Sequence, residues 1–256
     1  ASKKLLNFKF KKNREEINAP HFAMYIKEKL EKEFWDSILK KWWLKVFTTL
    51  DLDLQKKAEE LVKKNAEINL KKYDAENQAL LTMNTKNWEI LAMVGSKDYF
   101  DDEIDWQVNV LTQKRLAWST FKPFAYTSML LNWYSPYSIV FDVKTNFWEK
   151  WSDYEPQNFD WKFMWPLTLW KALWNSRNIP AIKAWLVWWI EKTYNIAKSM
   201  WIKFENAYDW YWASLPLWTV WVQWIDLLWA YMIFANNWEK IQPQSILKII
   251  DQDWII

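Results

Sequence analysis

Glycine is nearly absent from this 256-residue chain, since Gly95 is the only one, although the usual frequency of about 7% would give roughly 18. Cysteine is absent and histidine occurs once, as His21. A chain without cysteine has no disulfide framework and no thiolate metal site. No cluster of other ligand or catalytic side chains supports His21, so we expect it to have a packing or linker role, and we expect no metal and no cofactor.

Tryptophan is as abundant as glycine is scarce, with 25 residues. Seven of them directly follow Asn or Asp: Trp88, Trp106, Trp133, Trp161, Trp210, Trp238 and Trp254. Asn-Gly and Asp-Gly are strong turn signals because the turn requires φ > 0, which glycine adopts without steric cost and a bulky indole does not. The pattern therefore predicts that most of these tryptophans are glycines, encoded by UGA in a bacterial lineage that reads this codon as glycine.

The amino-acid composition agrees with this reading. The chain has 31 lysines and only 3 arginines, which is typical of an AT-rich genome. The alternative is a genuinely tryptophan-rich protein that stacks on sugars or lies at a membrane interface. That alternative predicts tryptophans gathered on one face or repeated at helical spacing. The observed scatter through turns and helix ends does not fit it.

The remaining bulk properties suit one domain or one and a half, with 51% apolar residues to fill a core and a net charge of +3. Residues 1–72 carry 18 basic against 11 acidic side chains, which favours a solvated lysine-rich surface over an anionic partner. Because the lysines are interspersed with acids and not with aromatics, nucleic-acid binding is not expected.

The longest nearly uncharged run covers residues 212–235, with Asp226 as its one charge. It is long enough to span a bilayer. Pro216, Gln223 and Asp226 interrupt it, however, and reading its tryptophans as glycine removes much of its apolarity. We therefore expect a buried helix behind a glycine-rich turn.

Hydrophobic periodicity and turn signals predict strands first, helices in the middle and a last strand near the end. Helices are expected from Pro20 towards Phe34, from a cap at Asp51 or Asp53, from near Ser119, and over 167–173, 181–190, 191–200 and 225–236. Strands are expected over 44–50 and 245–251, with a hairpin formed by 78–84 and 89–96. The irregular region 135–166 is long enough to be functional.

The sharpest chemical pattern is Ser119-Thr120-Phe121-Lys122 at the predicted start of a helix. Positions i and i+3 share one helix face, so the Ser119 hydroxyl and the Lys122 ammonium are expected within hydrogen-bonding distance. A serine nucleophile needs a nearby base, and a lysine serves when desolvation and positive neighbours lower its pKa. The free N–H groups of the helix start favour a developing oxyanion. Alone, this spacing is common on surface helices.

A second pattern, Ser176-Arg177-Asn178, lies between two predicted helices. It matches the Ser-x-Asn element that accompanies Ser-x-x-Lys in penicillin-interacting serine enzymes. Ser176 is placed to relay a proton between Lys122 and a leaving amine, and the Asn178 amide both donates and accepts hydrogen bonds.

Several stretches together resemble one protein family. With tryptophan read as glycine they are GSTFKPFAY at 118–126, GPLTLGKALGNSRNIPAIK at 165–183, SLPLGTVGV at 214–222, LKVFTTLDLDLQKKAEE at 44–60 and GEILAMVGSKDY at 88–99. In this order, over nearly the whole chain, they resemble the transpeptidase domain of class A penicillin-binding proteins, the bifunctional peptidoglycan synthases. Family glycines then coincide with Trp88, Trp118, Trp189, Trp201, Trp218 and Trp238, whereas Trp221 and Trp224 align with glycine less obviously.

The resemblance implies an α/β fold of the serine β-lactamase and penicillin-binding-protein transpeptidase type, mainly an antiparallel sheet flanked by helices. It implies D,D-transpeptidation of peptidoglycan stem peptides at the extracytoplasmic face of the bacterial cytoplasmic membrane. Ser119 would attack the D-Ala-D-Ala bond and would be acylated by β-lactams. Lys122 would be the general base, Ser176 the proton shuttle and Asn178 a substrate-orienting group.

The resemblance also implies a domain organisation. Residues 1–34 are expected to be the linker or tail of an upstream glycosyltransferase region, and 35–256 the transpeptidase domain, C-terminally incomplete because the chain ends before the family's Lys-Thr-Gly motif. This fragment is accordingly expected to be a poor catalyst, and membrane contact is expected only through an anchor outside it. Arg115 and Arg177 adjoin the two motifs and are given no catalytic role.

Two rival functions stay open. One is hydrolysis of the same acyl-enzyme, as in a D,D-carboxypeptidase or a β-lactamase, which needs a positioned deacylating water. The other is a non-catalytic glycan- or membrane-binding cell-wall module.

Overall fold

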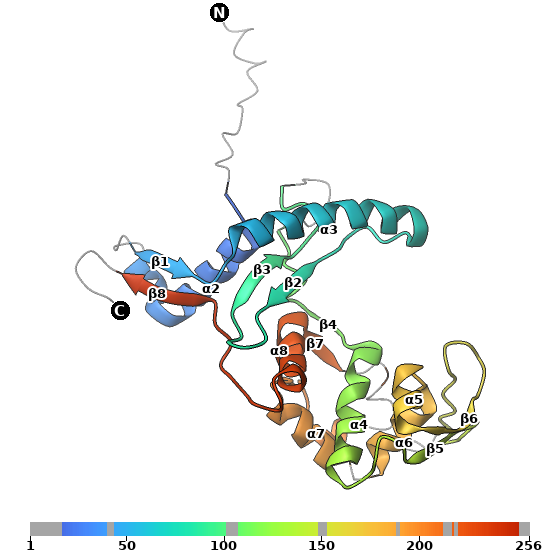
Figure 1. Cartoon of the computed structure of the whole chain (residues 1–256). Helices are drawn as coiled ribbons and strands as arrows, with labels where there is room; N and C mark the ends of the chain where they lie inside the picture. Colours follow the sequence, from blue (N-terminus) through green and yellow to red (C-terminus); the bar gives the residue numbers. More distant parts are fainter. Residues whose placement is uncertain are drawn as a thin grey trace, which may run out of the picture. The chain divides into compact units, whose positions relative to one another are not determined.

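The computed structural model describes residues 17–39, 44–100, 107–147, 153–187, 190–211, 217 and 220–250. The chain divides into two compact units (Figure 1). Unit 1 comprises Ala1–Leu80, Leu91–Gln107 and Ser245–Ile256, and unit 2 comprises Leu81–Ile90 and Val108–Gln244.

Unit 1 combines two helices with short strands. Its elements are α2 (Pro20–Leu39), β1 (Lys45–Thr48), α3 (Leu52–Tyr73) and β8 (Ile246–Ile250), together with most of β3 (Ile90–Val94). β1 pairs antiparallel with β8, so the chain's first described strand lies beside its last. Ala58 and Val62 of α3 pack against Ala92 and Val94 of β3 in a small core.

The predicted cap of α3 is confirmed at Asp51. The Asp51 carboxylate accepts from the backbone N–H groups of Asp53 and Leu54, both at 3.0 Å, which satisfies two of the donors that a helix start leaves unpaired. The predicted hairpin is confirmed as β2 (Leu80–Met83) paired with β3.

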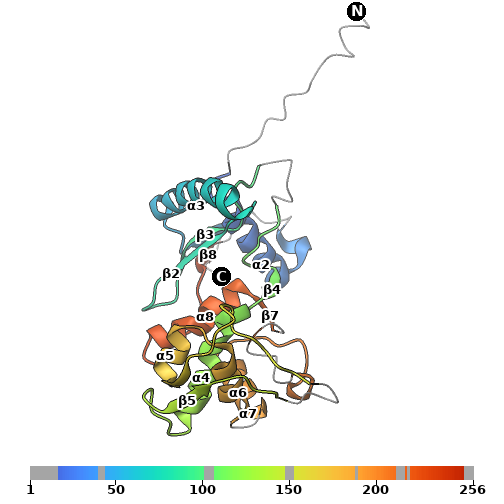
Figure 2. The ribbon, with the colours of Figure 1, turned by 90° about the vertical axis from the view of Figure 1, so that its right-hand side faces the viewer.

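Unit 2 is built mainly of helices, which gather around α4 (Figures 1 and 2). The helices are η1 (Trp118–Phe121), α4 (Lys122–Leu131), α5 (Leu169–Trp174), α6 (Asn178–Leu186), α7 (Ile190–Ser199), η2 (Tyr208–Trp210) and α8 (Trp224–Ala235). Two strand pairs flank them, β4 (Lys114–Leu116) with β7 (Trp221–Gln223) and β5 (Ile139–Asp142) with β6 (Trp165–Thr168). Phe121, the N-cap of α4, packs on Trp185 and Phe204 and on Phe124 of the first turn. The first turn of α4 is therefore buried in the core of this unit.

The α/β fold class is confirmed, with one difference in the sheet. The described strands form four two-stranded sheets instead of one larger sheet. Three of these pairs are antiparallel with a defined register. Strands of only three to five residues provide few ladder hydrogen bonds each, and helices separate the pairs along the chain.

Two element predictions are wrong in their bounds. The helix expected over 167–173 begins at Leu169, because Leu167 and Thr168 finish β6 and the Thr168 hydroxyl accepts from the Lys171 N–H at 3.2 Å as an N-cap. The helix expected from Ala181 begins at Asn178. The region 135–166 is less irregular than expected, since it holds β5 and the start of β6.

The buried helix expected within 212–235 is confirmed as α8. Its one carboxylate, Asp226, is buried and pairs with the Lys203 ammonium at 2.9 Å. The turn expected before it falls largely on 212–216 and 218–219, outside the described residues. Among the helices that the structure describes, none combines the length and apolarity needed to cross a bilayer.

Among the residues that the structure describes, eleven non-glycine residues have positive φ, and seven of these are tryptophans. The seven are Trp88, Trp118, Trp133, Trp161, Trp165, Trp201 and Trp238, with φ between 50° and 71°. Of the tryptophans that follow Asn or Asp, four are in this set and Trp210, within η2, is not. Trp106 and Trp254 lie outside the described residues. Trp201 lies two residues after the last residue of α7 (Ile190–Ser199), where Ile202 N–H donates to Ala197 O at 3.2 Å, as at a glycine-ended helix.

Candidate active site

Ser119 lies in η1, on the turn that leads into α4. The Ala117 N–H donates to Val220 O at 2.8 Å, and the Tyr231 hydroxyl donates to Thr120 O at 2.7 Å, so this turn is held from both sides. The Ser119 side chain is exposed, although Phe121 two residues later is fully buried. A hydroxyl at the surface end of a buried helix is accessible to a substrate while its backbone is fixed.

Lys122, one turn further on, is buried with 1% of its surface exposed. Its ammonium donates to Asn178 Oδ1 at 2.6 Å, to Ser176 Oγ at 3.1 Å and to Ser176 O at 2.5 Å. Burial, and next the positive charge of Arg177, lower the pKa of Lys122 from 10.5 to about 8. This is the direction that a lysine general base requires.

The structure thus brings three of the four predicted site residues together, namely Lys122, Ser176 and Asn178. It does not join Ser119 to Lys122 as expected, because no hydrogen bond links these two described side chains. The Lys122 ammonium points instead to oxygen atoms of the 176–178 turn, where Ser176 is exposed and Asn178 is buried. The buried Asn178 Oδ1 needs a donor.

The 176–178 turn is shaped by the end of α5. Ser176 has φ of 51°, and its N–H donates to Leu173 O while the Arg177 N–H donates to Ala172 O, both at 2.9 Å. These two bonds form the Schellman arrangement that ends a helix with a left-handed residue. Serine rarely adopts this left-handed backbone conformation. Strained backbone of this kind occurs at functional sites. It turns the Ser176 hydroxyl towards Lys122.

Sequence reasoning missed the residues that surround this turn. Arg177 is buried and its guanidinium donates to Asp142 Oδ2 at 2.8 Å and to Asp160 Oδ2 at 3.0 Å. Asn158 donates to Asp142 Oδ1 at 2.9 Å and accepts from the Asn178 N–H at 2.8 Å. The length of region 135–166, which supplies Asp142, Asn158 and Asp160, was the available signal, but nothing in it indicated which side chains would reach the site.

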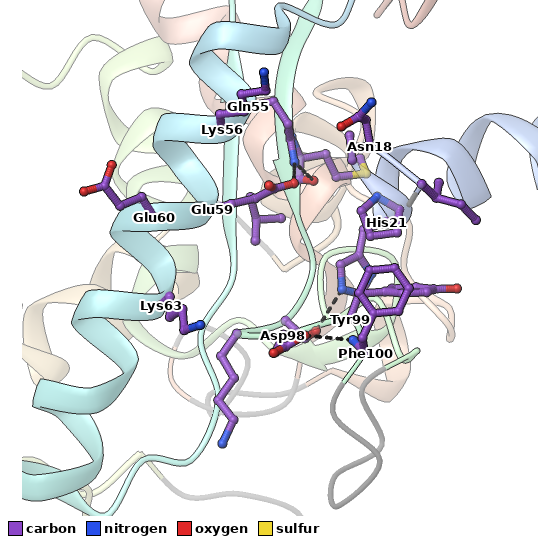
Figure 3. Close-up of a pocket in the computed structure, with 17 residues that line it drawn as sticks. Asn18, His21, Gln55, Lys56, Glu59, Glu60, Lys63, Asp98, Tyr99 and Phe100 are labelled. Atoms are coloured by element: carbon purple, nitrogen blue, oxygen red, sulfur yellow. Dashed lines mark hydrogen bonds between the residues drawn. The ribbon is translucent and has the colours of Figure 1, made fainter. Parts of the chain in front are cut away.

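The lone histidine has the packing role that the sequence indicated. His21 Nε2 lies 2.8 Å from Ser96 Oγ, and the Tyr99 ring packs edge-on against the imidazole at 4.9 Å. This contact borders a hollow of about 440 Å³ in unit 1, lined also by Gln55 and Glu59 of α3 (Figure 3). Burial lowers the pKa of His21 to about 4. Across the described part of the chain, no three His, Asp or Glu side chains are grouped in a way that would hold a metal ion.

No family model matches this chain, but several curated proteins are similar to it. It is 30% identical over 213 residues to penicillin-binding protein 2D of Bacillus subtilis, covering 81% of this chain and 29% of that protein. It is 29% identical over 182 residues to penicillin-binding protein 1A of Pseudomonas aeruginosa, covering 70% of this chain and 21% of that protein. The chain thus spans less than a third of the length of the curated relatives it matches.

Solved structures agree at the level of the fold. Penicillin-binding protein 1A from Haemophilus influenzae superposes with a TM-score of 0.79 over 94% of this chain and 50% of that one, at 18% identity. The penicillin-binding protein PonA1 from Mycobacterium tuberculosis gives a TM-score of 0.76 over 93% of this chain and 63% of that one, at 16% identity.

Proposed function

Since this chain is a member of the penicillin-binding protein family, with class A proteins as homologues and the fold of their transpeptidase domains, we propose that it catalyses D,D-transpeptidation of peptidoglycan stem peptides. The observation that carries the proposal is the buried ammonium of Lys122, within 3.1 Å of both Ser176 Oγ and Asn178 Oδ1, on the helix that Ser119 precedes. A buried lysine that contacts only neutral oxygens and has a lowered pKa contributes little to stability. These properties are instead typical of a general base.

In the acylation step, neutral Lys122 takes the proton from Ser119 Oγ as this oxygen bonds to the carbonyl carbon between the two terminal D-alanines. The C–N bond breaks, and Ser176 passes a proton from Lys122 to the leaving nitrogen, so that D-alanine is released and an ester on Ser119 remains. Asn178 orients the peptide through its amide. An amine from a neighbouring strand then attacks the ester, which forms the new amide and returns the proton to Ser119.

A β-lactam would follow the first half of this route as a mimic of the dipeptide. Its amide C–N bond would break in the same way, but the protonated ring nitrogen would stay attached to the acyl group and not be released. By the same proposal, residues 1–34 are the tail of an upstream glycosyltransferase region and 35–256 belong to the transpeptidase domain. The whole protein then acts at the extracytoplasmic face of the bacterial cytoplasmic membrane, on stem peptides that end in D-Ala-D-Ala.

The hydrolytic rival requires a base for a deacylating water. In the described part of the site the two carboxylates nearest the motifs, Asp142 and Asp160, are both paired with Arg177. Asp142 also accepts from Met164 N–H at 2.9 Å and from Asn158. Carboxylates committed in this way are poor general bases, which favours transfer to an amine over hydrolysis.

The test uses the full-length protein that contains this chain, made once with tryptophan as printed and once with glycine at the seven positive-φ tryptophans. Covalent labelling by a fluorescent penicillin is expected in wild-type protein and is expected to be lost in Ser119→Ala. A stem pentapeptide offered with an acceptor amine should give a cross-linked product, and release of only the shortened peptide acid would favour the carboxypeptidase. Folded protein that is not labelled in either version would overturn the proposal and favour the binding module.

A further inference from the structure

A buried ion pair lies directly behind the second motif. The Arg177 side chain is 6% exposed and that of Asp142 is 0% exposed, and their charged atoms are 2.8 Å apart. Asp142 lies at the end of β5, 35 residues before Arg177. Breaking a buried pair of this kind leaves an uncompensated charge, so the pair fixes the turn strongly to the strand.

The same carboxylate reaches the motif by a second route. Asn158 donates to Asp142 through Nδ2 and accepts the backbone N–H of Asn178 through Oδ1. Arg177 also donates to the Lys162 carbonyl, to which Asn158 donates at 2.8 Å. Arg177, which lies between Ser176 and Asn178, and the backbone of Asn178 itself are thereby tied to one buried carboxylate.

We propose that Arg177 and Asp142 are positioning residues, whose ion pair holds the 176–178 turn so that Ser176 Oγ and Asn178 Oδ1 both face the Lys122 ammonium. Arg177 also acts at a distance, because its charge opposes protonation of Lys122. Neither residue touches the substrate in this proposal. The inference rests on the proposed function.

The experiment measures the second-order rate constant of acylation by a fluorescent penicillin from pH 6 to 9. It uses whichever full-length version, with tryptophan or with glycine at the seven positions, the penicillin labels. Arg177→Met is expected to lower the rate constant at pH 7 at least about tenfold and to move the midpoint of the pH profile upwards by about one unit, because the cation that opposes protonation is lost while Asp142 stays. Lys171→Met removes an exposed cation from the neighbouring helix α5 and should leave both values unchanged.

Asp142→Asn/Arg177→Met keeps the shapes and removes both charges, so it provides a folded variant if the single change unfolds the protein. We expect the double variant to acylate more slowly than wild type as well, since an amide and a thioether do not pair. A rate within about twofold of wild type with an unmoved midpoint, in either variant, would overturn the inference. Absence of labelling in wild type would instead refute the proposed function.

The backbone carries a second, independent inference. Tryptophan at positive φ places Cβ against the following carbonyl, yet seven positions adopt it, with φ from 50° to 71°. Trp88 is buried in the core and Trp201 packs against it, but the set shows no shared packing role. Trp133 and Trp161 are 97% and 77% exposed, and the buried indole N–H groups of Trp88 and Trp201 have no hydrogen-bond partner.

We infer that these seven residues are glycines in the protein as its own cells make it. Glycine adopts positive φ without steric cost, and a UGA codon read as glycine by the cell and written as tryptophan in the sequence accounts for all seven. The test is peptide mass spectrometry of the protein from the organism that carries the gene, together with the codon at each position. Glycine at all seven, each encoded by UGA, is expected, and tryptophan at any of them would overturn the inference for the set.

Discussion

Lys122 is charged in water at neutral pH, and its burial beside Arg177 lowers its pKa to about 8. In the proposed acylation step the base is the neutral amine, whose fraction rises tenfold per pH unit below the pKa and then levels off. The acylation rate constant of the full-length protein is therefore expected to rise about tenfold from pH 6 to pH 7 and to flatten above about 8. A profile that is flat from pH 6 to 9 would contradict the role of Lys122.

His21 gives a second pH dependence at the residue scale, of stability and not of rate. Burial holds its pKa at about 4 in the folded protein, against about 6.5 in the unfolded chain. Because only the unfolded chain takes up a proton between these values, stability is lost as the pH falls from 6.5 towards 4. Between pH 7 and pH 5 the loss is about 2 kcal/mol.

Hydrogen exchange of α2 peptides, corrected for intrinsic rates, measures this loss in the full-length protein. The matched variant is His21→Gln, which keeps a side-chain hydrogen-bonding group near Ser96 but does not titrate. Wild type should lose about 2 kcal/mol more protection than the variant between the two pH values. An equal loss in both would show that another group is responsible.

The sequence was most informative where chemistry depends on close spacing. Ser119, Lys122, Ser176 and Asn178 stand in two short patterns, and the structure brings the last three together. Asp142 was not predictable, because its contact with Arg177 spans 35 residues and depends on how β5 packs beside α6. Single carboxylates in a long loop carry no signal of such a partner.

At the scale of elements, α3 offers a direct measurement. Asp51 Oδ1 accepts from two N–H groups of its first turn, and an N-cap of this kind contributes about 1 kcal/mol. Asp51→Ala is expected to lower the stability of α3 by about that amount, measured by hydrogen exchange of its peptides, whereas Asp51→Ser should lose at most a few tenths of a kcal/mol. A loss just as large in the serine variant would mean that charge, and not capping, is responsible.

The accuracy of the predicted elements follows their length and their end signals. Helix α3 has 22 residues, an acidic cap and a regular apolar spacing, so it was predicted nearly to its first residue. Strands β5 and β6 have four residues each, too few for alternation to be distinguished from loop sequence. Their pairing also depends on long-range packing, as does the division of the sheet into separate pairs.

At the scale of the whole molecule, the candidate active site and the His21 contact lie in different units. All four predicted site residues, and the network of Asp142, Asn158 and Arg177 behind them, belong to unit 2. Unit 1 holds the His21 contact and the hollow beside α3. Stability changes in unit 1, such as those at Asp51 and His21, are therefore expected to leave the acylation profile unmoved.

The fold as a whole also responds to the seven positive-φ tryptophans. A residue held in this region costs of order 1–3 kcal/mol, so seven together cost about as much as the 5–15 kcal/mol by which a domain is stable. Full-length protein made with these tryptophans should accumulate as insoluble material, and replacing all seven by glycine should restore soluble, cooperatively melting protein.

Trp170 and Trp174 provide the control, because they stack on each other within helix α5, where glycine costs about 1 kcal/mol per residue. Replacing this pair by glycine should lower the melting temperature of the soluble version. If this replacement instead stabilised the protein as much as replacement of the seven positive-φ tryptophans does, the removal of surface indoles, and not backbone geometry, would govern folding.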